Sequence, residues 1–191
     1  MSVSFALEAR RGFDNLAHQF GMSCVASNDR EVRYESDCAI LILNFDNGRS
    51  FELGIEIGRK KLAQLEQTFS LAEVLRLRGV MQAAAIDGMM VSQADRLPDA
   101  LACLARLISQ HASDFLMGRD FSFAQAAKLR KKERDAYALE GALRSARARS
   151  EAAWEKRDYQ GVVQALEPLE QHLSLAEKKR LDYSRRHVSP L

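Results

Sequence analysis

One stretch of alternating residues constrains the fold of this chain more than any other feature. Between Ser50 and Ile57, apolar side chains take every second position, and the positions between them hold polar residues or glycine. The apolar set is Phe51, Leu53, Ile55 and Ile57, and the polar set is Ser50, Glu52, Gly54 and Glu56. A period of two indicates a β-strand with one buried face and one face in water. Because the chain after Gly58 has mainly helical periodicity, the sequence predicts an α+β fold with helices over the buried face.

The predicted sheet is a four-stranded antiparallel meander that follows an N-terminal helix. Apolar residues recur at helical spacing over residues 4–20, and Gly21 is expected to end that helix. The four strands are predicted at residues 22–27, 31–36, 38–45 and 50–58. Asp46-Asn47-Gly48-Arg49 is expected to turn the chain between the last two strands, since Asn-Gly favours a hairpin.

Helices are predicted for most of the chain after the sheet. Ser70 and Glu73 have the spacing of a capping box, which predicts a short helix that ends at Gly79. Residues 80–92 are expected to be helical with an interruption at Asp87-Gly88. A further helix, from Pro98 to Gly118, carries an apolar stripe and is expected to lie across the sheet.

The C-terminal part reads as a helical extension. A long helix is predicted over residues 122–157, followed by a helical hairpin whose second helix begins with another capping box at Ser174. We therefore expect two domains, an α+β domain over residues 1–118 and an extension over residues 119–191.

Basic residues are concentrated on the predicted long helix. Residues 119–157 hold 11 Lys or Arg against 6 Asp or Glu, although the whole chain has a formal net charge of only +2. The excess lies at positions 128–149: Lys128, Arg130, Lys131, Lys132, Arg134, Arg144, Arg147 and Arg149. Such a row can contact phosphates of nucleic acid. We interpret it as a solvated helix face, because acidic residues interrupt it, and nucleic-acid binding is the alternative.

No group of residues has the spacing of a catalytic or metal site. Asp46, Glu52 and Glu56 lie on one predicted hairpin, but the lysine that metal-dependent nucleases place two residues after a strand carboxylate is replaced by Gly54 and Gly58. The histidines, at positions 18, 111, 172 and 187, are isolated from one another and from other ligands at short spacing. We therefore predict a protein that is not an enzyme and that has no catalytic residue, cofactor or metal.

The number of cysteines and the hydropathy of the chain indicate the cellular compartment in which the protein is expected. Three cysteines are an odd number, which is typical of buried free thiols in a reducing compartment. No apolar run approaches the ~20 residues that span a bilayer, and no targeting signal is visible. A cytoplasmic protein that does not enter membranes is the expectation.

A narrow apolar stripe on the long helix predicts a binding surface. It consists of Ala126, Leu129, Ala136, Leu139, Leu143, Ala146 and Trp154. Small residues let another helix approach closely, and flanking arginines can pair with acids across the contact. We therefore assign partner binding to Leu139, Leu143, Arg147 and Trp154, and expect a homodimer.

Several short runs resemble a group of bacterial proteins. They are Val32-Arg33-Tyr34-Glu35-Ser36, Asn44-Phe45-Asp46, Arg49-Ser50-Phe51-Glu52-Leu53 and Phe69-Ser70-Leu71-Ala72-Glu73-Val74-Leu75. In these runs the chain resembles small uncharacterised bacterial proteins, some of which are regarded as toxin-immunity proteins. The resemblance implies a protein that binds another protein, such as a cognate toxin, and has no chemistry of its own.

Overall fold

The computed structural model describes residues 4–60 and 68–188, which form two compact units. Unit 1 extends to Arg130, and unit 2 begins at Lys131. The boundary lies inside the helix α6 (Asp120–Glu155), whereas the sequence suggested a boundary after residue 118. The difference arises because Phe123 and Ala126, in the first turns of α6, are buried in the core of unit 1.

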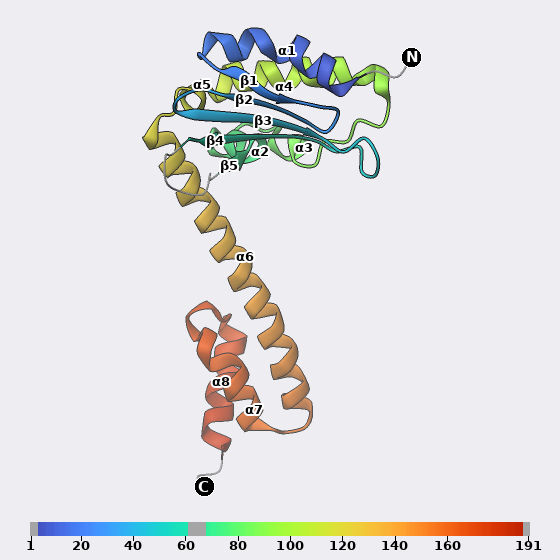
Figure 1. Ribbon diagram of the computed structural model, residues 1–191. Coiled ribbons are helices and arrows are strands. Elements are labelled where there is room, and N and C mark those ends of the chain that lie inside the picture. The colour runs from blue at the N-terminus through green and yellow to red at the C-terminus, as the bar shows by residue number, and fades with distance from the viewer. Residues whose placement is uncertain (1–3, 61–67, 189–191) are drawn as a thin grey trace. The chain divides into compact units, whose positions relative to one another are not determined.

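Unit 1 contains an antiparallel sheet in which each strand pairs with the next along the chain (Figure 1). The strands are β1 (Ser23–Ser27), β2 (Glu31–Glu35), β3 (Ala39–Phe45), β4 (Leu53–Arg59) and β5 (Thr68–Ser70). The predicted α+β class is confirmed, but the predicted count of four strands is wrong, since the described residues form five. The sequence gives no sign of β5 because its three residues are too few to show a period of two.

The alternation along β4 sorts its side chains as predicted. Leu53, Ile55 and Ile57 are each less than 5% exposed. Their partners on β3 are Phe45, Leu43 and Leu41, and cross-strand partners point to the same face, so these residues form one continuous layer of core.

Phe51 departs from this pattern. It precedes β4, has a φ of +54° and is 39% exposed, so its assignment to the buried face is wrong. A positive φ takes the residue out of the extended conformation on which the period of two depends.

Two helices of unit 1 pack side by side. α1 (Phe5–Gln19) is capped by Ser4 and followed by Gly21 in the left-handed conformation, as predicted, and it lies against α4 (Leu97–His111). The predicted helix from Pro98 to Gly118 is interrupted at Ala112. The short α5 (Ser113–Leu116) that follows contacts β3 and β4, whereas α4 packs mainly on α1.

The remaining helices of unit 1 are short. α2 (Leu71–Leu77) begins at the predicted capping box of Ser70 and Glu73 and is followed by Gly79 with positive φ, so this prediction is confirmed. The expected helix over residues 80–92 is wrong for most of its length, since only α3 (Ala83–Ile86) forms. A 3₁₀ turn, η1 (Ala94–Arg96), leads into α4.

Unit 2 is built from three helices and a 3₁₀ segment. The later turns of α6 pack with α7 (Tyr159–Leu166), η2 (Glu167–His172) and α8 (Leu175–His187). The buried residues of their hydrophobic cluster are Ala146, Val162, Leu166, Leu173 and Leu181. The second capping box, formed by Ser174 and Glu177, is confirmed at the start of α8.

Two chemical expectations can be compared directly with the structure. All three cysteines are free thiols, but the predicted burial is wrong, since Cys24 and Cys103 are half-buried and Cys38, just before the start of β3, is exposed. Over residues 4–60 and 68–188, no helix has the length and apolar character needed to cross a bilayer.

Candidate functional site

Three of the four side chains assigned to partner binding make contacts inside unit 2. Leu143 and Trp154 pack against its buried cluster, and Arg147 donates to a Glu177 carboxylate oxygen at 2.6 Å. Leu139 is half-buried and belongs to neither described hydrophobic cluster. The stripe is therefore used within the chain in its C-terminal half.

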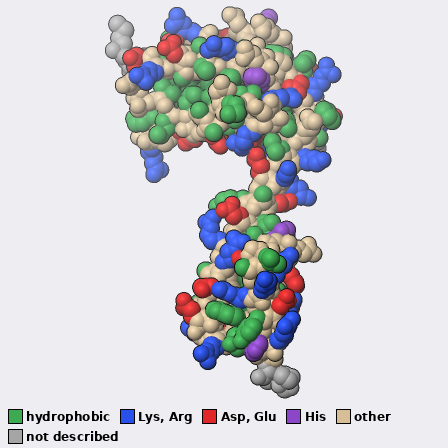
Figure 2. Space-filling model, turned by 180° about the vertical axis from the view of Figure 1, so that it is seen from behind, with side chains coloured by type: hydrophobic (Ala, Val, Ile, Leu, Met, Phe, Trp, Pro, Cys, Tyr) green, Lys and Arg blue, Asp and Glu red, His purple; other side chains and the backbone are tan. Residues whose placement is uncertain are grey.

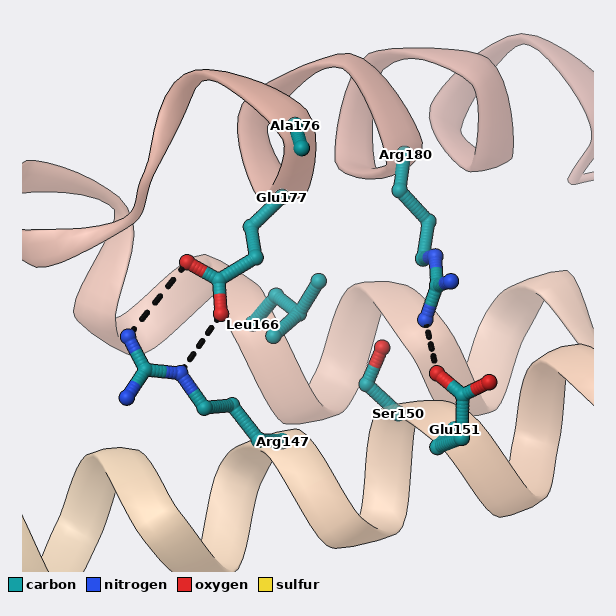
Figure 3. A pocket seen from close by; sticks show the side chains of 7 residues that line it. All are labelled: Arg147, Ser150, Glu151, Leu166, Ala176, Glu177 and Arg180. Carbon is teal, nitrogen blue, oxygen red and sulfur yellow. Dashed lines mark hydrogen bonds and ion pairs between the residues drawn. The ribbon is translucent and has the colours of Figure 1, made fainter.

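The region around Arg147 is a polar cavity between α6 and α8. Figure 3 shows two ion pairs that cross between these helices in opposite directions, Arg147 with Glu177 and Arg180 with Glu151. Hydrogen bonds from Arg147 and from Ser174 lower the pKa of Glu177 to about 2. The cavity measures about 320 Å³.

The buried hydroxyl of Ser150 faces this cavity and has no hydrogen-bond partner among the described residues (Figure 3). The nearby carboxylates of Glu177 and Glu151 are each paired with an arginine rather than with this hydroxyl. The arrangement stabilises the contact between the two helices.

An aromatic cluster joins the three helices of unit 2. The rings of Trp154, Tyr159 and Tyr183 meet edge to face, with centroids 5.5–5.9 Å apart, and His187 stacks on Tyr183 at 3.9 Å. Arg180 lies over the Trp154 ring at 5.1 Å. Trp154, which the sequence analysis assigned to partner binding, thus contacts side chains of α7 and α8.

The basic row on α6 is partly neutralised by ion pairs. Arg130 pairs with Glu73, Arg144 with Glu140 and Arg147 with Glu177. Basic and acidic side chains are interspersed on the face of unit 2 seen in Figure 2. This pattern favours a solvated helix face over a continuous phosphate-binding surface.

Two carboxylates of the β3–β4 hairpin, Asp46 and Glu56, have structural partners. Asp46 accepts hydrogen bonds from the Ser50 hydroxyl and from the backbone N–H groups of Gly48, Arg49 and Ser50, which lower its pKa. Glu56 accepts a hydrogen bond from the Thr68 hydroxyl at 2.6 Å. Across the described ranges, no group of three or more His, Cys, Asp or Glu side chains could hold a metal ion.

The most unusual surface of unit 1 lies beside the start of β4. The Val91 N–H donates to the Phe51 carbonyl and the Leu53 N–H donates to the Met89 carbonyl, both at 2.8 Å, so residues 89–91 pair with the segment before β4. These bonds hold Phe51 at its positive φ with its ring partly in solvent. Met90, from the paired segment, is 70% exposed.

A hollow of about 520 Å³ adjoins this pairing. Its apolar lining comes from Met89, Met90, Val91 and Ala100, and Arg96 and Asp99 add charges of both signs. We refer to Phe51, Met89, Met90, Val91 and Ala100 together as the Phe51–Met90 patch. Hydrophobic side chains also gather on the face of unit 1 seen in Figure 2.

The Phe51–Met90 patch does not follow from the sequence patterns. Alternation assigns Phe51 to the buried face, and composition assigns residues 89–91 to a helix. The available signal is the run Met89-Met90-Val91 directly after Asp87-Gly88, which is apolar but follows a turn.

Comparisons with protein-family models, with curated proteins and with solved structures found no match to this chain.

Proposed function

We propose that this chain is a non-catalytic protein-binding protein and that the Phe51–Met90 patch is its contact surface. The observation that carries the proposal is Phe51, a bulky residue at positive φ that is 39% exposed. A non-glycine residue in this region costs about 1–3 kcal/mol, and such strain is concentrated at functional sites. In this position the strain places an aromatic ring at the surface rather than in the core.

The chemistry of the patch suits a protein partner. Aromatic side chains are frequent at the energetic centres of interfaces, and methionines adapt their shape to an incoming apolar side chain. The hollow beside Met90 can receive such a side chain, while Arg96 and Asp99 supply the polar rim that interfaces commonly have. In keeping with the resemblance to toxin-immunity proteins, the partner class we propose is a cognate toxin in the cytoplasm.

Nucleic-acid binding through residues 128–149 is the second candidate. Lys128, Lys131 and Lys132 have no ion pair among the described residues, and Tyr137 on the same helix is 80% exposed. Binding through these groups would weaken steeply with added salt. A filter-binding titration at two salt concentrations separates it from the leading proposal, which predicts no such binding.

The experiment that tests the leading proposal uses Phe51→Gly. Glycine adopts positive φ without cost, so relief of strain offsets the lost ring packing and the stability should change by less than about 1 kcal/mol. Partner binding should nevertheless fall, because the exposed ring is gone. Met90→Glu is the second patch variant, and Met81→Glu is the matched control, since Met81 is 93% exposed and does not line the hollow.

A partner is first captured from the cells that encode the chain, identified by mass spectrometry, and then purified. Calorimetric titration should show binding to the wild type and to Met81→Glu, and binding at least tenfold weaker to both patch variants, or about 1.4 kcal/mol. A purified partner that binds all four proteins equally would contradict the assignment of the patch. The absence of any partner that binds in pure form would contradict the function itself.

A further inference from the structure

A polar hollow of about 720 Å³ lies at the β3–β4 hairpin end of the sheet in unit 1. Its lining comes from the residue before β2, from the β3–β4 turn and from the first half of β4. Backbone hydrogen bonds hold these segments side by side. The Phe45 N–H donates to the Arg30 carbonyl at 2.9 Å, and the Asp46 N–H donates to the Glu52 carbonyl at 3.0 Å. The hollow shares no lining residue with the Phe51–Met90 patch, so its use is independent of the contact surface proposed above.

A glycine inside β4, Gly54, lines this hollow. It pairs with Asn44 without a shift in register, and its φ is not positive, so neither a bulge nor a left-handed conformation requires glycine there. A Cβ added to Gly54 would meet no atom within 4 Å, so no other segment of the described chain approaches it closely. Because glycine weakens the interior of a strand, the remaining common reason for it is the close approach of a ligand to the backbone.

Four polar side chains that line the hollow have no partner among the described residues. Arg30 and Arg49 are exposed, and their guanidinium groups form no ion pair. The side-chain amide of Asn44 is half-buried and forms no hydrogen bond, and the Glu52 carboxylate is unpaired. Two cations, an amide and an anion are thus available to a ligand around the open space at Gly54.

The charges around the hollow favour a ligand that carries charges of both signs. The two guanidinium groups have the geometry to bind a carboxylate. Three carboxylates also line the hollow, so a ligand with several negative charges is disfavoured. Two of them, Asp46 and Glu56, already accept hydrogen bonds within unit 1, which leaves Glu52 for a cationic group. The Asn44 amide can donate to and accept from a peptide bond.

We propose that this hollow binds a short peptide with free termini. The peptide carboxylate is bound by Arg30 and Arg49, and its terminal ammonium group pairs with Glu52. Its peptide bond meets the Asn44 amide, and its main chain lies over Gly54, where no side chain stands in the way. The volume of the hollow is within the range of about 300–1,000 Å³ that is typical of small-molecule sites.

Calorimetric titration of the full chain with the dipeptide alanylalanine tests the proposal. The wild type should bind it with a dissociation constant of about 1 mM or lower. N-acetyl-alanylalanine lacks the ammonium group and alanylalanine amide lacks the carboxylate, so each should bind about tenfold more weakly or worse. Inorganic phosphate, the second probe, should not bind. Binding of phosphate without binding of the dipeptide would overturn the proposed class of ligand.

Substitutions of the lining residues locate the site. Arg49→Gln should weaken binding of alanylalanine about tenfold or more, since one guanidinium is lost. Glu52→Gln should remove the preference for alanylalanine over its N-acetyl derivative. Gly54→Val should abolish binding without lowering the melting temperature, because valine favours strands and its side chain enters the open space. Arg106→Gln is the matched control, since Arg106 is exposed and does not line the hollow.

The outcomes separate this site from nonspecific binding and from misfolding of a variant. Arg49 is exposed in a turn, so Arg49→Gln should keep the melting temperature of the wild type and decides the matter even if Gly54→Val does not fold. A wild type that does not bind alanylalanine would overturn the proposal. So would equal affinities for the free and the capped dipeptides, or equal affinities of Arg49→Gln and Arg106→Gln for alanylalanine.

Discussion

Arg130 is the residue whose loss should destabilise unit 1 most clearly through polar contacts. Its guanidinium donates to both carboxylate oxygens of Glu73, at 2.5 and 2.7 Å, and to the Thr68 carbonyl at 2.7 Å. The same group lies over the ring of Phe69, which is itself 1% exposed. One side chain from the start of α6 thus connects α2 and β5.

The magnitude follows from these contacts. Hydrogen bonds that involve charged groups contribute about 1.5–3 kcal/mol, and a cation over a ring adds about 0.5–1 kcal/mol. The Arg130 side chain is 38% exposed, so solvent screening reduces the sum. We expect Arg130→Ala to lower the free energy of unfolding of unit 1 by about 2 kcal/mol, part of which reflects the Glu73 carboxylate left without its partner.

Hydrogen exchange measured by mass spectrometry on the full chain can read this effect for unit 1 alone. Amides of β4, β5 and α2 should exchange about 30-fold faster in Arg130→Ala, which corresponds to about 2 kcal/mol if exchange requires opening of this region. Trp154, the one tryptophan, lies in unit 2, and its fluorescence during urea unfolding should stay unchanged.

Arg134→Ala is the matched control for this prediction. It lies one helical turn further along α6, is 74% exposed and approaches Asp135 only to 3.9 Å. Its replacement should change protection by less than about 0.5 kcal/mol. If Arg130→Ala and Arg134→Ala gave the same exchange rates, the reasoning from the Glu73, Thr68 and Phe69 contacts would be refuted.

Three further predictions follow from particular positions. Gly118→Ala should destabilise unit 1, because Gly118 has a φ of +67° and an added Cβ would lie 2.7 Å from the Cys38 Cβ. Gly141→Ala, at a position of α6 with open space around it, should instead stabilise the helix by about 0.5–1 kcal/mol. Equal melting temperatures for the two variants would contradict this prediction. Ile55→Asp should unfold unit 1 or make it insoluble, while Glu56→Lys should cost much less, and the reverse order in thermal melts would mean that the register of β4 is misassigned. The lowered pKa of Glu177 contributes stability that is complete above the unfolded-state pKa of about 4.3 and is lost as the pH falls toward about 2. Acid unfolding followed by Trp154 fluorescence should therefore depend less on pH in Arg147→Ala than in the wild type. Identical acid titrations of the two proteins would argue against the ion pair.

The elements that could be predicted from sequence are those whose signals are local. Both capping boxes depend on a serine and a glutamate three residues apart, and both begin helices in the structure. The buried face of β4 follows from alternation over three residues, Leu53, Ile55 and Ile57. The predicted turn at Asp46 forms because its carboxylate accepts backbone hydrogen bonds from the next few residues.

The predictions that were wrong concern elements whose structure depends on residues distant in the chain. Residues 80–92 are rich in alanine and methionine, which favour helix, yet residues 89–91 pair with the segment before β4. The same pairing holds Phe51 outside the strand that its sequence position suggested. β5 forms because Phe69 pairs with Ile57 on β4, and a segment of three residues gives no sequence pattern from which that pairing could be predicted.

The sequence by itself determined the class of fold, the main helices and strands, and which face of β4 is buried, because periodicity and caps act within a few residues. Only the tertiary structure decided how the functional side chains are used. It turned Leu143, Arg147 and Trp154 toward contacts within unit 2, and it left Phe51 and Met90 exposed in two paired segments. The physical reason is that the burial of a side chain depends on which segments contact each other in space. The free energy of those contacts comes from packing between residues that are far apart in the chain.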